Sequence, residues 1–443
     1  MARLGRVPFT VYLILLATLV VLIGKAVYHP TTANFFLFAY GITVTSIVLV
    51  LFFIAFHRYR DPAVLGRQLP SSRKKRYLVS CMVAAHNEEA IIAQCVQSLI
   101  DQTYGRREII IVNDASTDGT KAVLDSFKGV KVIHLEKNVG KKKALAQAML
   151  HAKGDLFVFT DSDSVLADDA VQRVVDAFNL DPLIGAVAGH CRALNGNKNL
   201  LTRIQDAWYE GQFSVRKAFE SVFGCVTCVS GPLAAFRREA IYNFIPAWEQ
   251  DTFFGKEFKF ATDRTLTGFV LGSRSVGEKL KRKHANSPFL KVDYPLREWR
   301  IVYSKSARSW TKVPETVKGF LRQQVRWKKS FIRNLFFTGK FYWKKPFLPA
   351  LFYYLHILFV FSGPLIAFRY LVYFPAQGNV MSAILYLCGI IFVGFMFGLA
   401  YRIESRDHKW VYRPLMSLTS TLILTWLTFY ALATIRRSTW HRG

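Results

Sequence analysis

Between two hydrophobic regions of the chain stands the stretch Asp155-Leu156-Phe157-Val158-Phe159-Thr160-Asp161-Ser162-Asp163. Its short, uninterrupted apolar run predicts a buried β-strand of the kind found in parallel sheets. The carboxylates of Asp161 and Asp163 follow at the carboxyl end of that strand, where such sheets bind their ligands. Mg²⁺ and Mn²⁺ prefer hard oxygen donors and commonly share their coordination between one or two carboxylates and substrate phosphates. Because surface loops often contain Asp-x-Asp, it is the position at a strand end that indicates a metal site.

From Tyr77 onward, strand and helix patterns alternate along the chain. The predicted strands are Tyr77–Ala85, Glu108–Asn113, Lys131–Leu135, Asp155–Thr160 and Ile184–Gly189. The predicted helices are Glu88–Asp101, Asp118–Phe127, Lys141–His151 and Asp168–Phe178. The strands show little polar alternation, which is typical of a mostly parallel sheet covered by helices on both faces. An α/β domain with one pocket at a single sheet edge is therefore predicted, because polar clusters follow three of its strands: His86-Asn87-Glu88, Asn113-Asp114 and Asp161-Ser162-Asp163.

Hydrophobic blocks long enough to cross a bilayer lie on both sides of this domain. The hydrophobic share of 51% and the aromatic share of 15% are high for a wholly soluble protein. Ala33–Phe56 holds 24 residues without a charge, enough to cross a core of about 30 Å at about 1.5 Å per residue. Phe9–Gly24 predicts an earlier span; a cleaved signal peptide is the alternative, although no clear cleavage site follows. The later blocks are Phe347–Tyr373, Val380–Ala400 and Pro414–Ile435.

The net charge of +29 comes from 59 Lys and Arg against 30 Asp and Glu. No nucleic-acid module is recognisable, so nucleic acid is not a predicted partner. The excess is concentrated beside the hydrophobic blocks, where the positive-inside rule and anionic lipid heads explain it. The flanking residues are Arg58, Arg60, Arg67, Arg73, Lys74, Lys75, Arg76, Arg436, Arg437 and Arg442. We expect a multi-pass protein of the plasma membrane, in contact with membrane lipids, whose central domain is cytoplasmic. Since Pro414–Ile435 has basic residues at both ends, it either re-enters on the cytoplasmic side or crosses against the positive-inside rule. We favour a re-entrant segment or a broken helix.

Two amphipathic stretches follow the α/β pattern. Ordinary core packing explains either of them, but basic residues crowd the second and a hydrophobic block follows it, which favours an interfacial helix. The apolar faces comprise Leu201, Ile204, Trp208, Val215 and Phe219 in the first stretch, and Val317, Phe320, Leu321, Phe331, Ile332, Leu335 and Phe336 in the second. The predicted division is two transmembrane helices in 1–60, a cytoplasmic domain in 75–310, an interfacial helix in 311–345 and a membrane region in 346–443.

An enzyme that uses a nucleotide diphosphate-sugar needs a grip on the nucleoside, a cation on the diphosphate and a base for the incoming hydroxyl. Asp114 follows a predicted strand and is a candidate nucleoside ligand, although the nearby Asp118-Gly119 indicates turn and capping chemistry. Lys141 opens a predicted helix, where a bound phosphate would offset the unfavourable charge; Lys142 and Lys143 fit a solvated face better. Asp263 is the candidate general base, with helix capping or an ion pair to Arg264 as the alternative.

Arg326 and Trp327 are adjacent in Gln323-Gln324-Val325-Arg326-Trp327. A guanidinium suits a diphosphate, and an indole face suits a sugar ring. A buried tryptophan beside a salt-bridged arginine would give the same pattern, so the two interpretations stay open at the level of sequence.

In combination, these motifs make the chain resemble the processive membrane-integrated glycosyltransferases of family 2, which include hyaluronan, chitin and cellulose synthases and the nodulation chitooligosaccharide synthases. The matching motifs, in order, are Asn113-Asp114, Asn138-Val139-Gly140-Lys141, Asp161-Ser162-Asp163, Thr262-Asp263-Arg264 and Gln323-x-x-Arg326-Trp327. The likeness covers nearly the whole chain and is strongest to the streptococcal type of hyaluronan synthase. That closer likeness is carried by Gly189-His190, Asn199-Leu200-Leu201-Thr202-Arg203, Ser230-Gly231-Pro232-Leu233 and the residues from Gln323 to Phe331.

The resemblance implies a GT-A-like domain inserted between membrane helices, using UDP-sugars and Mg²⁺ or Mn²⁺. It implies metal and donor contacts at Asp161 and Asp163, nucleoside contact at Asp114 and donor contact at Lys141. It further implies an acceptor-activating base at Asp263, diphosphate contact at Arg326 and acceptor-sugar stacking at Trp327. Similar enzymes invert the anomeric centre and pass the growing polysaccharide through their own transmembrane helices.

Three departures from the family pattern concern the product more than the reaction class. Asn113 stands where an aspartate is common, and Ala261-Thr262 replaces the usual glycine and acidic residue before the base. Trp440-His441-Arg442 differs from the Trp-Gly-Thr-Arg ending expected of the hyaluronan type.

The expected function is polymerisation of UDP-activated sugars at the cytoplasmic face with extrusion of the product. Hyaluronan made from UDP-GlcNAc and UDP-glucuronate is the first hypothesis, and chitin or chitooligosaccharide is the alternative. A rival of another class is a polysaccharide-export module whose sugar-binding domain is not catalytic. The presence of Asp161, Asp163 and Asp263 together argues against that rival, since an inactive domain has no need of all three.

Overall fold

The computed structural model describes residues 15–16, 19–20, 23, 35–405 and 407–437. At its centre lies an eight-stranded sheet in the order β3-β2-β1-β4-β7-β6-β10-β5. The strands are β1 Val79–Ala85, β2 Arg107–Asn113, β3 Lys131–His134, β4 Leu156–Phe159, β5 Ser164–Leu166, β6 Ile184–Ala193, β7 Ala234–Arg237 and β10 Arg300–Thr311. Strands β7 and β5 run against the other six, so the predicted mostly parallel sheet is confirmed.

The sheet is covered on both faces, as its apolar strands require. Successive side chains of β1 point to opposite faces: Val79 and Cys81 pack with helices α4 and α7, and Met82 packs with α6. The helices of this part are α4 Ile92–Ile100, α5 Thr120–Asp125, α6 Lys141–His151 and α7 Ala170–Leu180. All five predicted strands and all four predicted helices are present, with boundaries shifted by a few residues at most.

Strands β5, β7 and β10 complete the sheet, and the sequence patterns did not predict them. Strand β7 has only four residues, Ala-Ala-Phe-Arg, too few for a periodicity to emerge. Strand β10 contains the polar run Ser304-Lys305-Ser306, where its pairing with β6 is irregular between Tyr303 and Arg308.

A second group of elements packs beside the sheet. It contains α8 Leu200–Gly211, a π-helical segment Gln212–Lys217, α9 Ala218–Val222, α10 Arg238–Ile241, α11 Ile245–Glu249, the β8 Thr252–Phe253 and β9 Lys256–Glu257 ladder, α12 Thr262–Leu271 and α13 Ser273–Lys283. The first amphipathic stretch is confirmed as helical, and it begins at a capping box formed by Asn199 and Thr202. Helix α14, Val317–Thr338, contains the second stretch and packs against α12 and α19.

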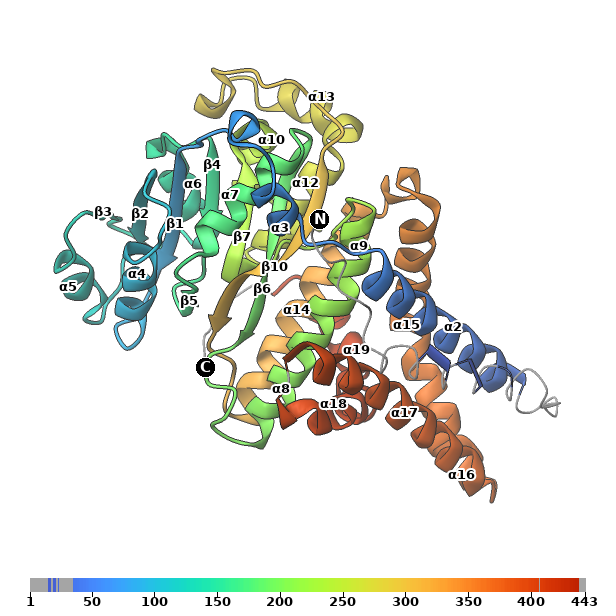
Figure 1. The fold of residues 1–443 in the computed structure, drawn as a ribbon. Coiled ribbons are helices and arrows are strands. Elements are labelled where there is room, and N and C mark those ends of the chain that lie inside the picture. Colours follow the sequence, from blue (N-terminus) through green and yellow to red (C-terminus); the bar gives the residue numbers. More distant parts are fainter. Residues whose placement is uncertain (1–14, 17–18, 21–22, 24–34, 406, 438–443) are drawn as a thin grey trace.

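Helix α3, Pro62–Arg67, packs against α7 and β10 of the sheet domain. The remaining helices form an apolar group: α2 Phe35–His57, α15 Phe347–Phe368, α16 Phe374–Ala376, α17 Val380–Ser405, α18 Arg413–Thr419 and α19 Leu427–Ala433. Three spans within the described residues are long and apolar enough to cross a membrane: Phe38–Arg67, Phe347–Ala376 and Val380–Ile403. Helices α2, α15 and α17 extend away from the sheet domain (Figure 1). Leu358 and Leu365 on α15 are 57% and 66% exposed, as expected for side chains that face lipid.

The last hydrophobic block is broken. His408–Leu424 and Leu427–Ala433 meet at an angle of 46°, which confirms the predicted interruption. The predicted first span, Phe9–Gly24, lies mostly outside the described residues, as does the Trp440-His441-Arg442 ending.

Candidate active site

A cavity of about 640 Å³ opens beyond the carboxyl ends of β4 and β6 and reaches the apolar helices. Six of the seven predicted site residues line it: Lys141, Asp161, Asp163, Asp263, Arg326 and Trp327. These residues come from segments separated by up to 186 positions, and the fold brings them to one cavity.

The two aspartates that follow β4 both line this cavity. Asp161 forms an ion pair with Lys141, the first residue of α6. The Thr311 hydroxyl donates a hydrogen bond to Asp163 Oδ1 at 3.3 Å. Burial and the neighbouring Asp161 charge raise the pKa of Asp163 to about 6.

This pair of carboxylates fits a small divalent cation. Two acidic groups close together in a partly buried site repel each other, and a cation between them would remove that cost. No cluster of three or more His, Cys, Asp or Glu side chains suited to a metal occurs within the described residues. Two hard oxygen ligands suit Mg²⁺ or Mn²⁺, which complete their coordination with substrate phosphates and water, far better than they suit zinc.

Asp263 lies in the first turn of α12, and the N-cap of that helix is Ala261 rather than Asp263. Its Oδ1 accepts the Arg264 backbone N–H at 2.7 Å, and its Oδ2 accepts the Gly231 N–H at 3.3 Å. The Arg264 guanidinium lies over the Phe331 ring, 6.0 Å from its centroid. Asp263 is thus oriented mainly by backbone donors, with its carboxylate on the cavity wall.

Gly231 connects the metal-binding end with Asp263, and the sequence patterns did not assign it a role in the site. Its N–H bonds Asp263, while a Cβ at this position would lie 2.8 Å from both carboxylate oxygens of Asp161. Only a residue without a side chain allows the backbone to approach Asp161 this closely. The glycine is visible in the motif Ser230-Gly231-Pro232. The need for it follows from the contact with Asp161, which lies 70 residues away in the sequence.

Asp114 is the predicted site residue that does not line the cavity. Its two carboxylate oxygens accept the backbone N–H groups of Val139 at 2.7 Å and Gly140 at 2.9 Å. Gly140 has a φ of 85°, so this turn needs a glycine. Asp114 therefore holds the turn that delivers Lys141 to Asp161, and its contact with a nucleoside stays a prediction.

Three aromatic rings form one wall of the cavity. The Trp327 ring lies 5.6 Å from Trp208 at 32° and 6.2 Å from Tyr209 at 34°. Trp208 was predicted only as part of an apolar helix face, because periodicity cannot separate a core residue from a cavity wall. Beside these rings, burial lowers the pKa of the Arg326 guanidinium, and the charges of Asp161 and Asp163 oppose that shift.

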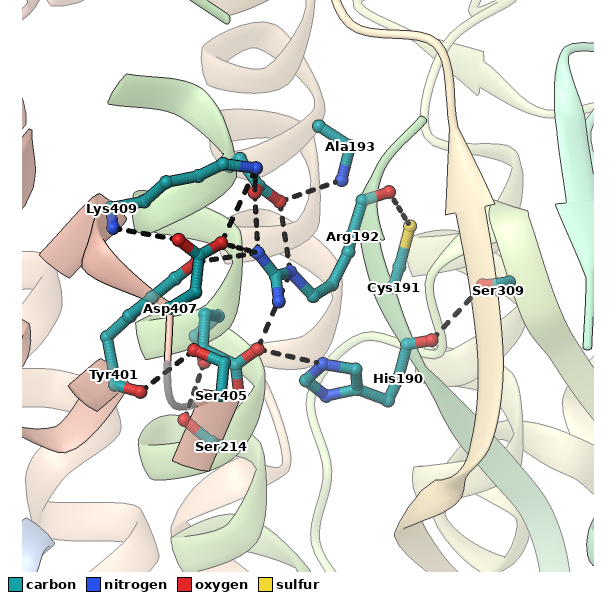
Figure 2. A network of polar contacts seen from close by, with 12 residues as sticks. His190, Cys191, Arg192, Ala193, Ser214, Ser309, Tyr401, Ser405, Asp407 and Lys409 are labelled. Carbon is teal, nitrogen blue, oxygen red and sulfur yellow. Dashed lines mark hydrogen bonds and ion pairs between the residues drawn. The ribbon is translucent and has the colours of Figure 1, made fainter. Parts of the chain in front are cut away.

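Helix α8 is also held by a polar network (Figure 2). Arg192 of β6 binds Asp206 of α8 through two hydrogen bonds of 2.6 and 3.1 Å, and it donates to the Tyr401 hydroxyl of α17 at 2.6 Å. Lys409 also binds Asp206, at 2.8 Å, and Tyr401 donates to Asp407 at 3.0 Å. This network ties the sheet, the helix that carries Trp208 and Tyr209, and the end of an apolar helix into one unit.

The cavity continues past Asp263 to the apolar helices. Its far end is lined by Tyr353 and His356 of α15, and by Ser420, Leu424 and Thr425 beside the bend between α18 and α19. The candidate active site is therefore continuous with the part of the molecule that is suited to a membrane.

Comparison with known proteins agrees with this geometry. The model of the family described as "Glycosyl transferase family 2" matches residues 80–244. The chain is 29% identical over 375 residues to the hyaluronan synthase of Streptococcus pyogenes, with 82% of this chain and 83% of the relative covered. It is 30% identical over 375 residues to an N-acetylglucosaminyltransferase of Rhizobium leguminosarum bv. viciae, with 82% and 80% covered. The chain therefore belongs to glycosyl transferase family 2.

Among solved structures, a mannosyltransferase from Pyrobaculum calidifontis, in complex with GDP-Man and Mn²⁺, shares the fold. Its TM-score is 0.50 at 20% sequence identity, and the match covers 85% of this chain and 98% of that one. The predicted GT-A-like domain between apolar helices is thereby confirmed.

Proposed function

We propose that this protein is a processive, inverting glycosyltransferase that polymerises UDP-sugars and extrudes the polysaccharide. One observation carries the proposal. Asp161, Asp163, Asp263 and Trp327 line a single cavity that continues to helix α15. A metal site, a base and an acceptor platform thus share one space with an exit toward the membrane.

The donor end is assigned to the diphosphate. Asp161 and Asp163 would hold Mg²⁺ or Mn²⁺, which would act as a Lewis acid on the departing diphosphate. Lys141 and Arg326 supply positive charge to the same group. Lys141 is bonded to Asp161, so the donor phosphates would compete for its ammonium on binding. Asp114 supports this end by holding the turn before Lys141, and we assign the nucleoside contact to it as well.

The acceptor end is assigned to Asp263 and the aromatic wall. As general base, Asp263 would take the proton of the acceptor hydroxyl while that oxygen attacks the anomeric carbon from the side opposite the diphosphate, which inverts the centre. Trp327, supported by Trp208 and Tyr209, would stack against the acceptor sugar. A flat apolar platform holds a sugar ring without fixing its position along the chain, which suits a polymer that must advance after each transfer.

We further propose that the catalytic domain, residues 75–310, lies in the cytoplasm of a multi-pass plasma-membrane protein. Residues 1–60 and 346–443 would form its membrane regions, and 311–345 would lie at the interface. Supporting this division, the amphipathic helix α14 packs between α12 of the catalytic domain and α19 of the apolar group. Membrane lipids would contact the exposed apolar side chains of α15 and α17.

Hyaluronan, made from UDP-GlcNAc and UDP-glucuronate, is the proposed product, and chitooligosaccharide is the second candidate. Similarity to the Rhizobium enzyme over 82% of the chain favours the second. Incubating the purified protein with each UDP-sugar alone and then with both separates them. Polymer that forms only with both donors supports hyaluronan, whereas polymer from UDP-GlcNAc alone contradicts it. A non-catalytic export module would release no UDP under any of these conditions.

A further inference from the structure

Besides Lys141 and Arg326, further cations line the cavity. Arg216 and Lys217 line it from the π-helical segment, Arg264 from α12 and Lys328 from α14. Two carboxylates, Asp263 and Glu220, line the same cavity. We call Arg216, Lys217, Arg264 and Lys328 the exit cations.

The two carboxylates are largely engaged by other donors. Glu220 accepts the Thr227 backbone N–H at 2.9 Å and the Thr227 hydroxyl at 3.0 Å, and its distance to Arg216 is 3.9 Å. Asp263 accepts the backbone N–H groups of Arg264 and Gly231. Neither carboxylate therefore forms a short, direct bond with an exit cation.

Apart from Arg216, the exit cations contact neutral groups. Lys217 donates to the Ser230 hydroxyl at 2.7 Å and lies 4.0 Å from the Phe213 ring centroid. Lys328 donates to the Thr428 hydroxyl at 2.9 Å, and Arg264 lies over Phe331. Hydroxyls and rings stabilise a cation less than an anion does, so the cluster has capacity for a negatively charged ligand.

The pKa shifts of the exit cations also indicate a site for an anion. Burial lowers the pKa of Lys328 to about 8. The pKa of Arg216 is lowered as well, by burial and then by the nearby Arg264 charge, against the opposing charge of Glu220. Burial makes a cation less stable than it is in water, and an anion bound among the exit cations would offset that cost.

We propose that the exit cations form a subsite for the carboxylate of a uronic acid unit in the growing polysaccharide. This inference rests on the proposed function and specifies the chemical class of the acceptor chain. The subsite shares a cavity with Asp263 and leads to His356 of α15, so it lies where the product must pass. The donor diphosphate is assigned other cations: Lys141, which pairs with Asp161, and Arg326, which feels the charges of Asp161 and Asp163. A neutral chain of N-acetylglucosamine has no negative charge that could stabilise these buried cations.

Binding of oligosaccharides to the full-length protein tests the proposal directly. The protein is placed in phosphatidylcholine nanodiscs with UDP and Mg²⁺, and the affinities of labelled hyaluronan hexasaccharide and labelled chitohexaose are compared. Arg216→Gln and Lys328→Met are each expected to lower the affinity for the hyaluronan hexasaccharide about tenfold, the usual effect of losing one hydrogen bond to a charged group. Chitohexaose affinity should change less than about twofold, because it carries no carboxylate.

The controls separate charge from folding. Arg322→Gln removes an exposed cation from the same helix and should leave both affinities as in the wild type. Lys328→Arg restores the charge and should recover most of the hyaluronan affinity, which a variant damaged in folding would not do.

Three outcomes would overturn the subsite. In the first, both hexasaccharides weaken equally in Arg216→Gln and Lys328→Met. In the second, the wild type binds chitohexaose as tightly as the hyaluronan fragment. In the third, the two variants change hyaluronan affinity only when anionic lipid is added to the nanodiscs. That result would show that the exit cations bind a lipid phosphate. Transfer from UDP-sugars by the wild type is measured in parallel, so failure of the proposed function would be seen separately.

Discussion

At the scale of single residues, the position of Asp263 is the most informative feature of the cavity. Its carboxylate is aimed by two backbone N–H groups, at 2.7 and 3.3 Å, and by the Cys228 thiol, which donates to Oδ2 at 3.6 Å. No cationic side chain forms a short bond with it, so its oxygens can approach a sugar hydroxyl, as a general base must.

Asp263→Asn tests this role. The amide keeps the shape, and its single oxygen can accept one of the two backbone N–H groups, but it cannot act as a base. We expect sugar transfer, measured as UDP release, to fall by about 10²- to 10⁴-fold, while UDP affinity measured by calorimetry stays near the wild-type value. Asp293→Asn, at an exposed aspartate, is the matched control and should transfer at the normal rate. An unchanged rate in Asp263→Asn would remove this residue from the mechanism.

Ala261 carries a local conformational cost next to the base. Its φ of 60° and ψ of 35° lie in the left-handed region, where a Cβ is unfavourable by roughly 1–2 kcal/mol. This explains physically why a glycine is usual at this position in the family that the sequence resembles. It also means that the turn before Asp263 is retained here at the expense of stability.

Ala261→Gly should therefore raise the free energy of unfolding by about 0.5–1 kcal/mol, after allowing for the greater freedom of glycine in the unfolded chain. The measurement is the thermal unfolding midpoint of the detergent-solubilised protein. Ala247→Gly in α11 has the same chemistry in a helix and should lower the midpoint. If both variants lowered the unfolding midpoint equally, the left-handed conformation of Ala261 would carry no free-energy cost.

At the scale of elements, α8 connects the site to the apolar helices. Trp208 and Tyr209 of this helix line the cavity, and its Asp206 is bound by Arg192 and Lys409 (Figure 2). The Asp206 side chain is 1% exposed, so its charge depends on these partners. The network thereby couples the acceptor wall to the segment that follows α17.

Asp206→Asn should destabilise the protein by about 3 kcal/mol, because it leaves two cations without their shared carboxylate. A shift of α8 would also displace the aromatic wall, so we expect shorter polysaccharide at a nearly normal initial rate of UDP release. Thermal unfolding and product sizing by gel filtration give the two readouts. Asp169→Asn breaks only the more exposed ion pair with Arg173 and should cost less than about 1 kcal/mol. Normal product length in Asp206→Asn would contradict the coupling.

At the scale of the whole molecule, the sheet domain and the apolar helices share one cavity. The catalytic groups lie at a sheet edge, and the far wall comes from α15 and the bend after α18. This arrangement requires the domain and the basic link between α17 and α18 to be on the same side of the membrane. The turn between α16 and α17 would then lie on the opposite side.

Cysteine labelling in intact cells tests that topology. In a Cys388→Ser background, Gln377→Cys in the exposed turn after α16 should react with a membrane-impermeant maleimide added outside. Lys279→Cys, exposed on α13 of the catalytic domain, should react only after the cells are opened. The reverse pattern would refute a cytoplasmic catalytic domain.

Sequence patterns predicted much of this molecule because they report local physics. Apolar runs of strand length, helical periodicity and uncharged blocks of bilayer length each depend on a few consecutive residues. They identified the parallel half of the sheet, the second amphipathic helix and the broken last block. The strand-end position of Asp161 and Asp163 likewise placed the carboxylates at one edge of the sheet.

The tertiary structure decided what depends on contacts between distant segments. It showed that Gly231 must be small because Asp161 lies against it, and that Asp114 holds the Lys141 turn rather than lining the cavity. It brought Trp208 and Tyr209 to Trp327, and gathered the exit cations from three helical segments into one space. A linear pattern depends on the polarity of each residue and its near neighbours. Which charged side chains share a cavity, and which backbone atoms approach each other closely, is decided only when distant segments fold around that cavity.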